Sequence, residues 1–278
     1  MQLESPLVST DWLAAHLREP DLIILDASMA PPGEQLSPDL ACIPGARRFD
    51  MDRQVCAPHS PLPHTLPSPE HFAALVEDMG ISNHSQIVVY DQAGLYSAPR
   101  AWWMFKIMGH DRIHILDGGL PLWQEQGHYT APTHGLSKEK GHFRPNFRGH
   151  LVVCAEDLLA AAQTGSPKIV DARSRPRFCG TQAEPRPGLR GGHIPGSLNL
   201  PFSELIQAGR LLDQPGLQQV FTALNLHKDQ ALAFSCGSGV TACIPLLAAY
   251  ICGFHRLALY DGSWAEWGAR SELPVQTD

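Results

Sequence analysis

The chain has 278 residues, of which 44% are hydrophobic and 18% charged, and its formal net charge is −7. This length accommodates two domains of about 130 to 140 residues each, and the composition is typical of a globular protein rather than a disordered one. Because the chain is acidic and shows no basic stripe, we expect no nucleic-acid partner.

The sequence shows no sign of export or of membrane insertion. Its N-terminus lacks a basic segment followed by an apolar run, as a signal peptide would require. The longest apolar run, Ile244 to Cys252, is far shorter than the ~20 residues of a membrane-spanning helix. Seven widely spaced cysteines without a C-x-x-C pair favour reduced thiols over disulfides or zinc sites. We therefore expect a cytoplasmic protein without a metal or cofactor.

Short apolar runs alternate with segments of helical periodicity along the chain. The expected strands, in chain order, are LIIL before Asp26, QIVVY before Asp91, KIV before Asp171, ALAFS before Cys236 and LALY before Asp261. Expected helices are DWLAAHLRE, FAALVEDMG, AEDLLAAAQ and VTACIPLLAAY, the last from Val240 to Tyr250. This alternation predicts an α/β protein with a small parallel sheet flanked by helices in each half.

Four landmarks occur twice, in the same order. LIILDAS matches PKIVDAR, CIPGARRFD matches HIPGSLNLP, QIVVYDQAG matches ALAFSCGSG, and ILDGGLPLW matches LYDGSWAEW, at offsets of 145, 151, 145 and 144 residues. This period is much longer than that of a solenoid repeat and indicates a duplicated domain. We expect an N-terminal domain over residues 1–130, a linker over 131–150 that is polar and rich in Gly and Pro, and a C-terminal domain over 151–278.

The second copy gains six residues between its first two landmarks and loses six before the third. The gained stretch includes residues 182–188, with the sequence QAEPRPG. Additional loop length in one copy points to function, because loops carry sites whereas strands carry packing. Arg186 lies in this insertion and is therefore a candidate site residue.

Cys236 lies where an expected strand turns into an expected helix, in the loop CGSGVT. The glycines allow successive N–H groups to point inward, and the helix adds its positive N-terminal end, so an anion at the centre is stabilised. Such a setting favours the thiolate, the nucleophilic form of cysteine. The corresponding residue of the first copy is Asp91. We therefore expect catalysis at Cys236 and a catalytically silent N-terminal domain.

These residues resemble the tandem rhodanese family over essentially the whole chain, and within it the 3-mercaptopyruvate sulfurtransferases. The resemblance rests on SAPRAWWMF, LDGGLPLW, EPRPG, GGHIPGSLN, CGSGVTA and YDGSWAEWGAR. It implies two rhodanese-like folds and a sulfurtransferase in which Cys236 carries sulfane sulfur as a persulfide. The implied donor is 3-mercaptopyruvate, with pyruvate released, and the implied acceptor is a thiol such as thioredoxin, or cyanide.

The resemblance also assigns roles in the site. Thiosulfate-preferring members carry Arg-Lys after the cysteine, whereas mercaptopyruvate-preferring members carry Gly-Ser, as here. Arg177 and Arg186 match the family's substrate arginines, and a guanidinium pair suits a carboxylate. Ser238 is expected to act in catalysis beside Cys236. The remaining expected substrate-binding residues are those of the loop, Gly237, Gly239, Val240 and Thr241.

One position departs from the family. Members often carry His before the first I-P-G, proposed to form a relay to the loop serine, and here that residue is Cys42. This leaves Ser238 as a hydrogen-bond donor to the substrate rather than the end of a relay. A thiol at position 42 also suggests a resolving cysteine for an oxidised Cys236, provided that the two lie close together.

Three alternatives remain. Thiosulfate is the competing donor, and a non-enzymatic persulfide carrier is the competing class of protein. Phosphatases with a rhodanese-like fold also centre on a cysteine loop, but they need an arginine six positions after the cysteine, where this chain has Ala242. Phosphate would lack its main counter-charge here.

Overall fold

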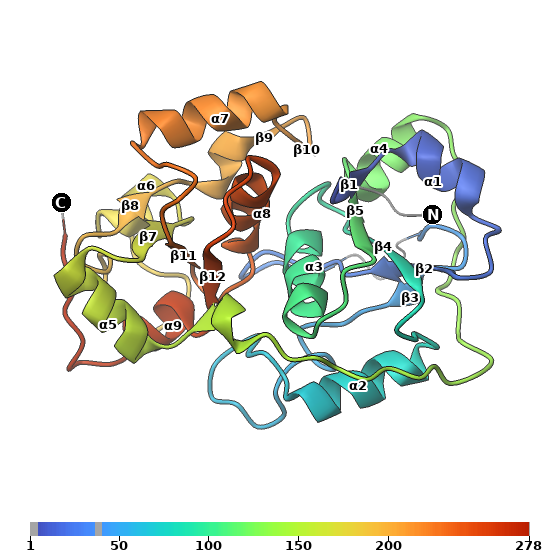
Figure 1. Cartoon of the computed structure of the whole chain (residues 1–278), viewed down its shortest axis with the longest axis horizontal. Coiled ribbons are helices and arrows are strands. Elements are labelled where there is room, and N and C mark those ends of the chain that lie inside the picture. Colours follow the sequence, from blue (N-terminus) through green and yellow to red (C-terminus); the bar gives the residue numbers. More distant parts are fainter. Residues whose placement is uncertain (1–4, 37–40, 278) are drawn as a thin grey trace. The chain divides into compact units, whose positions relative to one another are not determined.

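The computed structural model describes residues 5–36 and 41–277. These fall into two compact units: residues 5–36, 41–59, 66–148 and 208–210 form the first, and residues 60–65, 149–207 and 211–277 the second. Each unit is an α/β domain of its own (Figure 1).

The first unit contains a five-stranded parallel sheet in the order β1-β5-β4-β2-β3. Its strands are β1 (Leu7–Val8), β2 (Leu22–Asp26), β3 (Arg47–Arg48), β4 (Gln86–Tyr90) and β5 (Ile113–Leu116), and its helices are α1 (Thr10–His16), α2 (Pro69–Asp78), α3 (Ala98–Ile107) and α4 (Gly119–Glu125). Leu13 of α1 and Trp123 of α4 pack in one core cluster with the sheet. Phe72 of α2 and Phe105 of α3 pack edge to face, 5.0 Å apart, in a separate aromatic cluster.

The second unit repeats this sheet in the order β6-β12-β11-β7-β8. Its strands are β6 (Val152–Val153), β7 (Lys168–Asp171), β8 (Leu198–Asn199), β11 (Leu232–Ser235) and β12 (Leu257–Tyr260), and its helices are α5 (Ala155–Thr164), α6 (Arg175–Phe178), α7 (Gln214–Ala223), α8 (Cys243–Ile251) and α9 (Ser263–Trp267). A two-stranded pair, β9 (Ile206–Gln207) and β10 (Arg210–Leu211), and the 3-10 helices η1 (Gly149–Leu151) and η2 (Phe202–Leu205) complete the described elements. The equivalent strand orders confirm the duplicated α/β fold that the repeat predicts.

Local sequence signals explain where several helices begin. Ser68 precedes α2 and accepts the backbone N–H of His71, and Asp213 precedes α7 and accepts that of Gly216. In both helices proline follows within the first turn, where its missing N–H has no helical partner to lose. Polar caps and early prolines thus determine where these helices begin, and the apolar faces of the helices then pack on the sheets.

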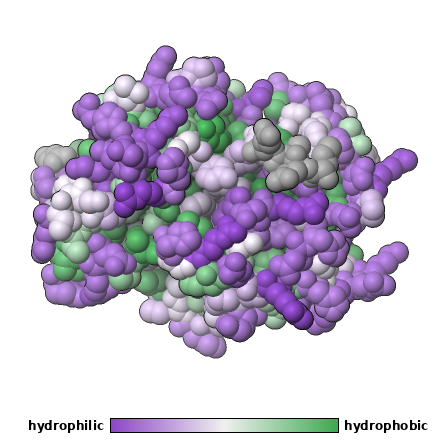
Figure 2. Space-filling model, in the orientation of Figure 1, coloured by the Kyte–Doolittle hydropathy of each residue, from purple (hydrophilic) through white to green (hydrophobic). Residues whose placement is uncertain are grey.

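Apolar side chains lie mostly inside these units. The large hydrophobic residues that are exposed in the described part of the chain are Tyr129, Leu136, Phe147 and Tyr250. The face shown in Figure 2 is accordingly dominated by hydrophilic residues, with smaller hydrophobic areas between them. No helix among residues 5–36 and 41–277 combines the length and apolar character needed to cross a membrane.

Two details differ from the sequence predictions. Helix α8 begins at Cys243 rather than Val240, so Pro245 lies in its first turn, where no helix hydrogen bond is lost. The segment 131–148, part of the expected linker, packs on the first unit: Ala131 pairs with Cys42, and the Nε2 atom of His134 lies 2.8 Å from Asp26 Oδ2. Polar and Gly-rich composition does not distinguish a linker from an irregular segment held by such contacts.

Candidate active site

Cys236 directly follows the buried strand β11 and is 1% exposed. Its N–H donates to Ser263 Oγ at 3.2 Å, and its carbonyl oxygen accepts the N–H of Trp264 at 3.0 Å. The carbonyl of Gly237 accepts the N–H of Ala265 at 2.9 Å. The start of α9 therefore fixes the backbone of the nucleophile from both sides, which preorganises the loop.

The equivalent loop of the first unit already holds an anionic group. The Asp91 carboxylate accepts the backbone N–H groups of Ala93 at 2.9 Å and of Tyr96, Ser97 and Ala98 at 2.8 Å each. Burial raises the pKa of Asp91, and the four N–H donors act in the opposite direction. Four converging N–H groups make this loop a site for an anionic group, and the Asp91 side chain occupies that site.

The loop of the second unit has a glycine with positive φ at the same position as the loop of the first unit. Gly239 has φ +76°, and Gly94, its counterpart in the first loop, has φ +94°. The carbonyls of Val240 and Thr241 accept N–H groups of α8 at 3.1 Å, so they point along the helix and away from Cys236. The second loop therefore shares the positive-φ glycine of the first loop, and Cys236 stands at the position where the first copy has a carboxylate.

Arg177 and Arg186 meet at Gly237. A methyl group placed on Gly237 would lie 3.1 Å from Arg177 Nη2 and 3.7 Å from Arg186 Nη1. Glycine thus leaves room beside Cys236 for two guanidinium groups, both from the second unit. A pair of guanidinium groups suits a carboxylate, because each guanidinium can donate two parallel N–H bonds to its oxygens.

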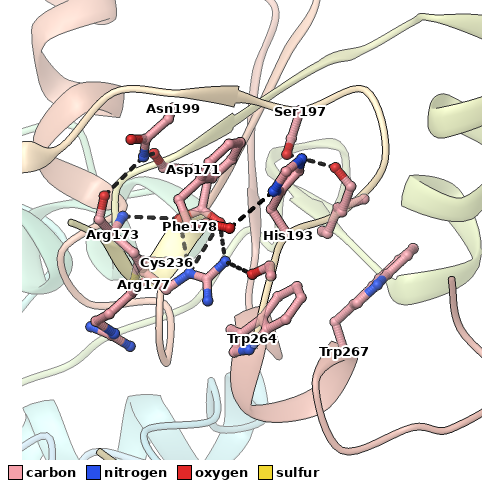
Figure 3. Close-up of polar contacts among 12 residues, drawn as sticks. Asp171, Arg173, Arg177, Phe178, His193, Ser197, Asn199, Cys236, Trp264 and Trp267 are labelled. Atoms are coloured by element: carbon pink, nitrogen blue, oxygen red, sulfur yellow. Dashed lines mark hydrogen bonds and ion pairs between the residues drawn. The ribbon is translucent and has the colours of Figure 1, made fainter. Parts of the chain in front are cut away.

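Arg177 is held by an ion network. Its Nε donates to Glu184 Oε1 at 3.2 Å and its Nη2 to Oε2 at 2.5 Å. Glu184 also accepts from Arg173 at 2.8 Å. Arg173 in turn pairs with Asp171 and lies over the ring of Trp264 (Figure 3). For Arg186, in contrast, no carboxylate of the described residues lies within ion-pair distance.

Ser238 is 7% exposed and lies between two basic groups. Arg186 Nη2 is 3.4 Å from its Oγ atom, and His64 Nδ1 is 2.9 Å from the same atom. His64 belongs to residues 60–65, which pack with the second unit although they lie in the first half of the sequence. It has φ +58°, a conformation that costs free energy and recurs at functional sites.

His64 was not predicted from the sequence. The family resemblance placed a histidine at position 42, where this chain has Cys42, whereas the structure brings a histidine to Ser238 from another loop. The only sequence signal was the histidine content of the irregular stretch around residues 57–71. A short contact between two loops far apart in sequence has no periodic signature.

Replacing His64 by Ala should lower kcat/KM for sulfur transfer by about 10- to 100-fold, because Ser238 loses the imidazole that orients its hydroxyl or exchanges its proton. Steady-state kinetics measure this effect. His59 also has a positive φ and belongs to the first unit, so His59→Ala is the matched control and should retain wild-type kinetics. Equal kinetics of His64→Ala and wild type would contradict the role of His64.

Cys42 is fully buried in the first unit, with its thiol 3.5 Å from the carbonyl oxygen of Ala131. Burial and the charge of Asp26 raise the pKa of this thiol. A resolving cysteine reacts as an accessible thiolate, so these observations argue against the suggested resolving role and favour packing.

Comparisons with known proteins agree with this fold and site. A family model described as "Rhodanese-like domain" matches residues 9–126 and again residues 155–270. The 3-mercaptopyruvate sulfurtransferase of Escherichia coli K12 is 42% identical over 282 residues, covering 97% of each chain. The mitochondrial thiosulfate/3-mercaptopyruvate sulfurtransferase 1 of Arabidopsis thaliana is 39% identical, covering 98% of this chain and 78% of that protein.

A solved structure extends this likeness to three dimensions. The crystal structure of SseA from Escherichia coli matches with a TM-score of 0.84 and 38% identity, covering 94% of this chain and 99% of that chain. The family resemblance that the motifs carried is thereby confirmed. The chain belongs to the tandem rhodanese family of sulfurtransferases, in the branch that contains the 3-mercaptopyruvate sulfurtransferases.

Proposed function

We infer that the chain transfers sulfane sulfur from 3-mercaptopyruvate to a thiol or to cyanide through a persulfide on Cys236. The observation that carries this function is the meeting of Arg177 and Arg186 at Gly237, the residue after the nucleophile. Two guanidinium groups there bind the carboxylate of a keto acid and place its sulfur against Cys236.

The reaction has two half-reactions. In the first, the Cys236 thiolate forms a bond to the substrate sulfur, and the carbon–sulfur bond breaks with its electron pair moving to carbon. The resulting enolate takes up a proton and leaves as pyruvate. In the second, an acceptor thiolate or cyanide attacks the outer sulfur, the sulfur–sulfur bond breaks, and the Cys236 thiolate is regenerated.

The other expected site residues support these steps. Ser238 Oγ lies within hydrogen-bonding distance of His64 and Arg186, so its hydroxyl is placed to stabilise the developing enolate oxygen or to pass a proton. The N–H groups of Gly237, Gly239, Val240 and Thr241 stabilise the thiolate and then the persulfide. No side chain at positions 237 and 238 adds positive charge for a dianionic donor.

The acceptor and the compartment are part of the proposal. The described residues include all seven cysteines, and none of them forms a disulfide, which suits a reducing compartment such as the cytoplasm. A reduced thiol protein such as thioredoxin is the acceptor expected there. Cyanide would serve as a chemically simpler acceptor.

The experiment is to mix the protein with 3-mercaptopyruvate and a thiol reductant and to measure pyruvate. Repeated turnover is expected, with a higher kcat/KM for 3-mercaptopyruvate than for thiosulfate. A single stoichiometric burst without turnover would instead identify a persulfide carrier. A preference for thiosulfate would overturn the proposed donor.

A further inference from the structure

An uninterrupted chain of charged groups leads from the sheet of the second unit to Arg177. Asp171, the last residue of β7, accepts Arg173 Nη2 at 2.7 Å. Arg173 Nη1 donates to Glu184 Oε1 at 2.8 Å, and Glu184 in turn accepts two bonds from Arg177. Glu184 therefore links a fixed strand end to an arginine of the site.

This chain is buried. The side chains of Arg173, Asp171 and Glu184 are exposed by 0%, 2% and 2%, and that of Arg177 by 19%. Buried charges persist only when they are paired. With both oxygens of Glu184 engaged by arginines, the orientation of the Arg177 guanidinium is fixed before any substrate arrives.

The described residues of the first unit form no such network. Asp26-Ala27-Ser28 of the first copy stands where the second has Asp171-Ala172-Arg173, and Asp26 accepts from Ser28 and His134 instead. Glu184 lies in the stretch that only the second copy contains. Both units form the same sheet, but among the described residues only the second has this network. The fold alone therefore does not require Glu184, which occurs only in the copy that carries the Cys236 loop.

The charges in this network cancel in pairs. Asp171 matches Arg173, and Glu184 matches Arg177. Arg186, for which the described residues provide no carboxylate partner, adds one positive charge beside Gly237. The Cys236 thiolate balances that charge, so the two guanidinium groups offer their hydrogen-bond donors in a site without surplus positive charge.

We propose that Glu184 is a specificity-determining residue that matches the site to a monoanionic sulfur donor. Its carboxylate neutralises Arg177 without blocking the guanidinium, so a substrate carboxylate finds two sets of hydrogen-bond donors but no surplus positive charge that would attract a second negative charge. Thiosulfate, a dianion, brings a second negative charge close to Glu184 and is disfavoured by repulsion. This inference rests on the proposed function, since it concerns the choice between two donors of the same site.

The test is the ratio of kcat/KM for 3-mercaptopyruvate to that for thiosulfate in wild type and in Glu184→Gln. Glutamine keeps the shape of the side chain and removes its negative charge. The ratio should fall by about tenfold or more, because the dianion gains more than the monoanion from the added net charge. The shift should diminish as salt is added, since screening weakens the charge effect.

Glu204→Gln is the matched control, because Glu204 is half exposed and pairs with Arg175 at 3.5 Å in the same unit. It removes the same charge from the surface and should leave the ratio unchanged. A parallel loss of both activities in Glu184→Gln, with an unchanged ratio, would reduce Glu184 to a structural role and overturn the inference.

Glu184→Asp provides a second test that keeps the charge and shortens the side chain. Both activities should decrease while their ratio stays within about twofold of wild type, since selectivity follows charge. A changed ratio in this variant would contradict the inference even if Glu184→Gln failed to fold. Failure of the wild type to release pyruvate from 3-mercaptopyruvate is a separate result, and it would overturn the proposed function instead.

Discussion

Replacing Cys236 by Ser should abolish sulfur transfer, with kcat/KM lowered by at least about a thousandfold, while the protein remains folded. The hydroxyl is a far weaker nucleophile than a thiolate and cannot carry the transferred sulfur. The backbone bonds of residue 236 to Ser263 and Trp264 do not involve the side chain and should survive. Pyruvate release measures the activity, and thermal unfolding checks the fold.

Cys179→Ser is the control for this experiment. Cys179 is a partly exposed thiol in the same unit, at the end of α6, and its loss should leave turnover near the wild-type rate. If Cys236→Ser retained substantial turnover and Cys179→Ser did not, the nucleophile would have to be reassigned.

Replacing Arg186 by Leu should cost about 2 to 4 kcal/mol of transition-state stabilisation, or roughly 30- to 1,000-fold in kcat/KM. Arg186 supplies a positive charge beside Gly237 that is not paired with a carboxylate of the described residues, and its Nη2 lies 3.4 Å from Ser238 Oγ. Its removal leaves Arg177, whose charge is already matched by Glu184. Steady-state kinetics with 3-mercaptopyruvate measure the effect.

Arg175→Leu removes an equal charge from α6, where Arg175 is 64% exposed and forms a surface ion pair with Glu204. Surface pairs contribute about 0 to 1 kcal/mol, so this variant should behave almost as wild type. Equal kinetics of the Arg186 and Arg175 variants would show that Arg186 does not bind the donor.

Much of the fold was predictable because it rests on patterns that repeat within the sequence. Apolar runs before Asp26, Asp91, Asp171 and Cys236 gave the central strands, and their spacing gave two equivalent domains. Cys236 was predictable for a related reason: a strand followed by a glycine-rich turn and a helix has a local signature. Arg186 was marked by the insertion, which needed only the internal comparison.

The remaining parts of the site depend on contacts that have no local signature. His64 reaches Ser238 across 174 positions of sequence, and the only hint was an unusual content of histidine. The ion pair between Arg173 and Glu184 likewise has no sequence signature, because it depends on two side chains that are buried together only in the folded protein. The segment 131–148 resembled a linker because its polar, Gly- and Pro-rich sequence has no periodic pattern. Its contacts with the first unit are irregular and leave no such pattern.

The central claim is that Cys236 carries the sulfur between the two half-reactions. The most direct measurement is mass spectrometry of the peptides after one addition of 3-mercaptopyruvate without an acceptor, together with a pyruvate assay. One added sulfur atom on the Cys236 peptide is predicted, with one pyruvate per chain, and subsequent addition of a thiol or cyanide should remove it. Sulfur found on another cysteine, or pyruvate released while Cys236 stays unmodified, would contradict the account.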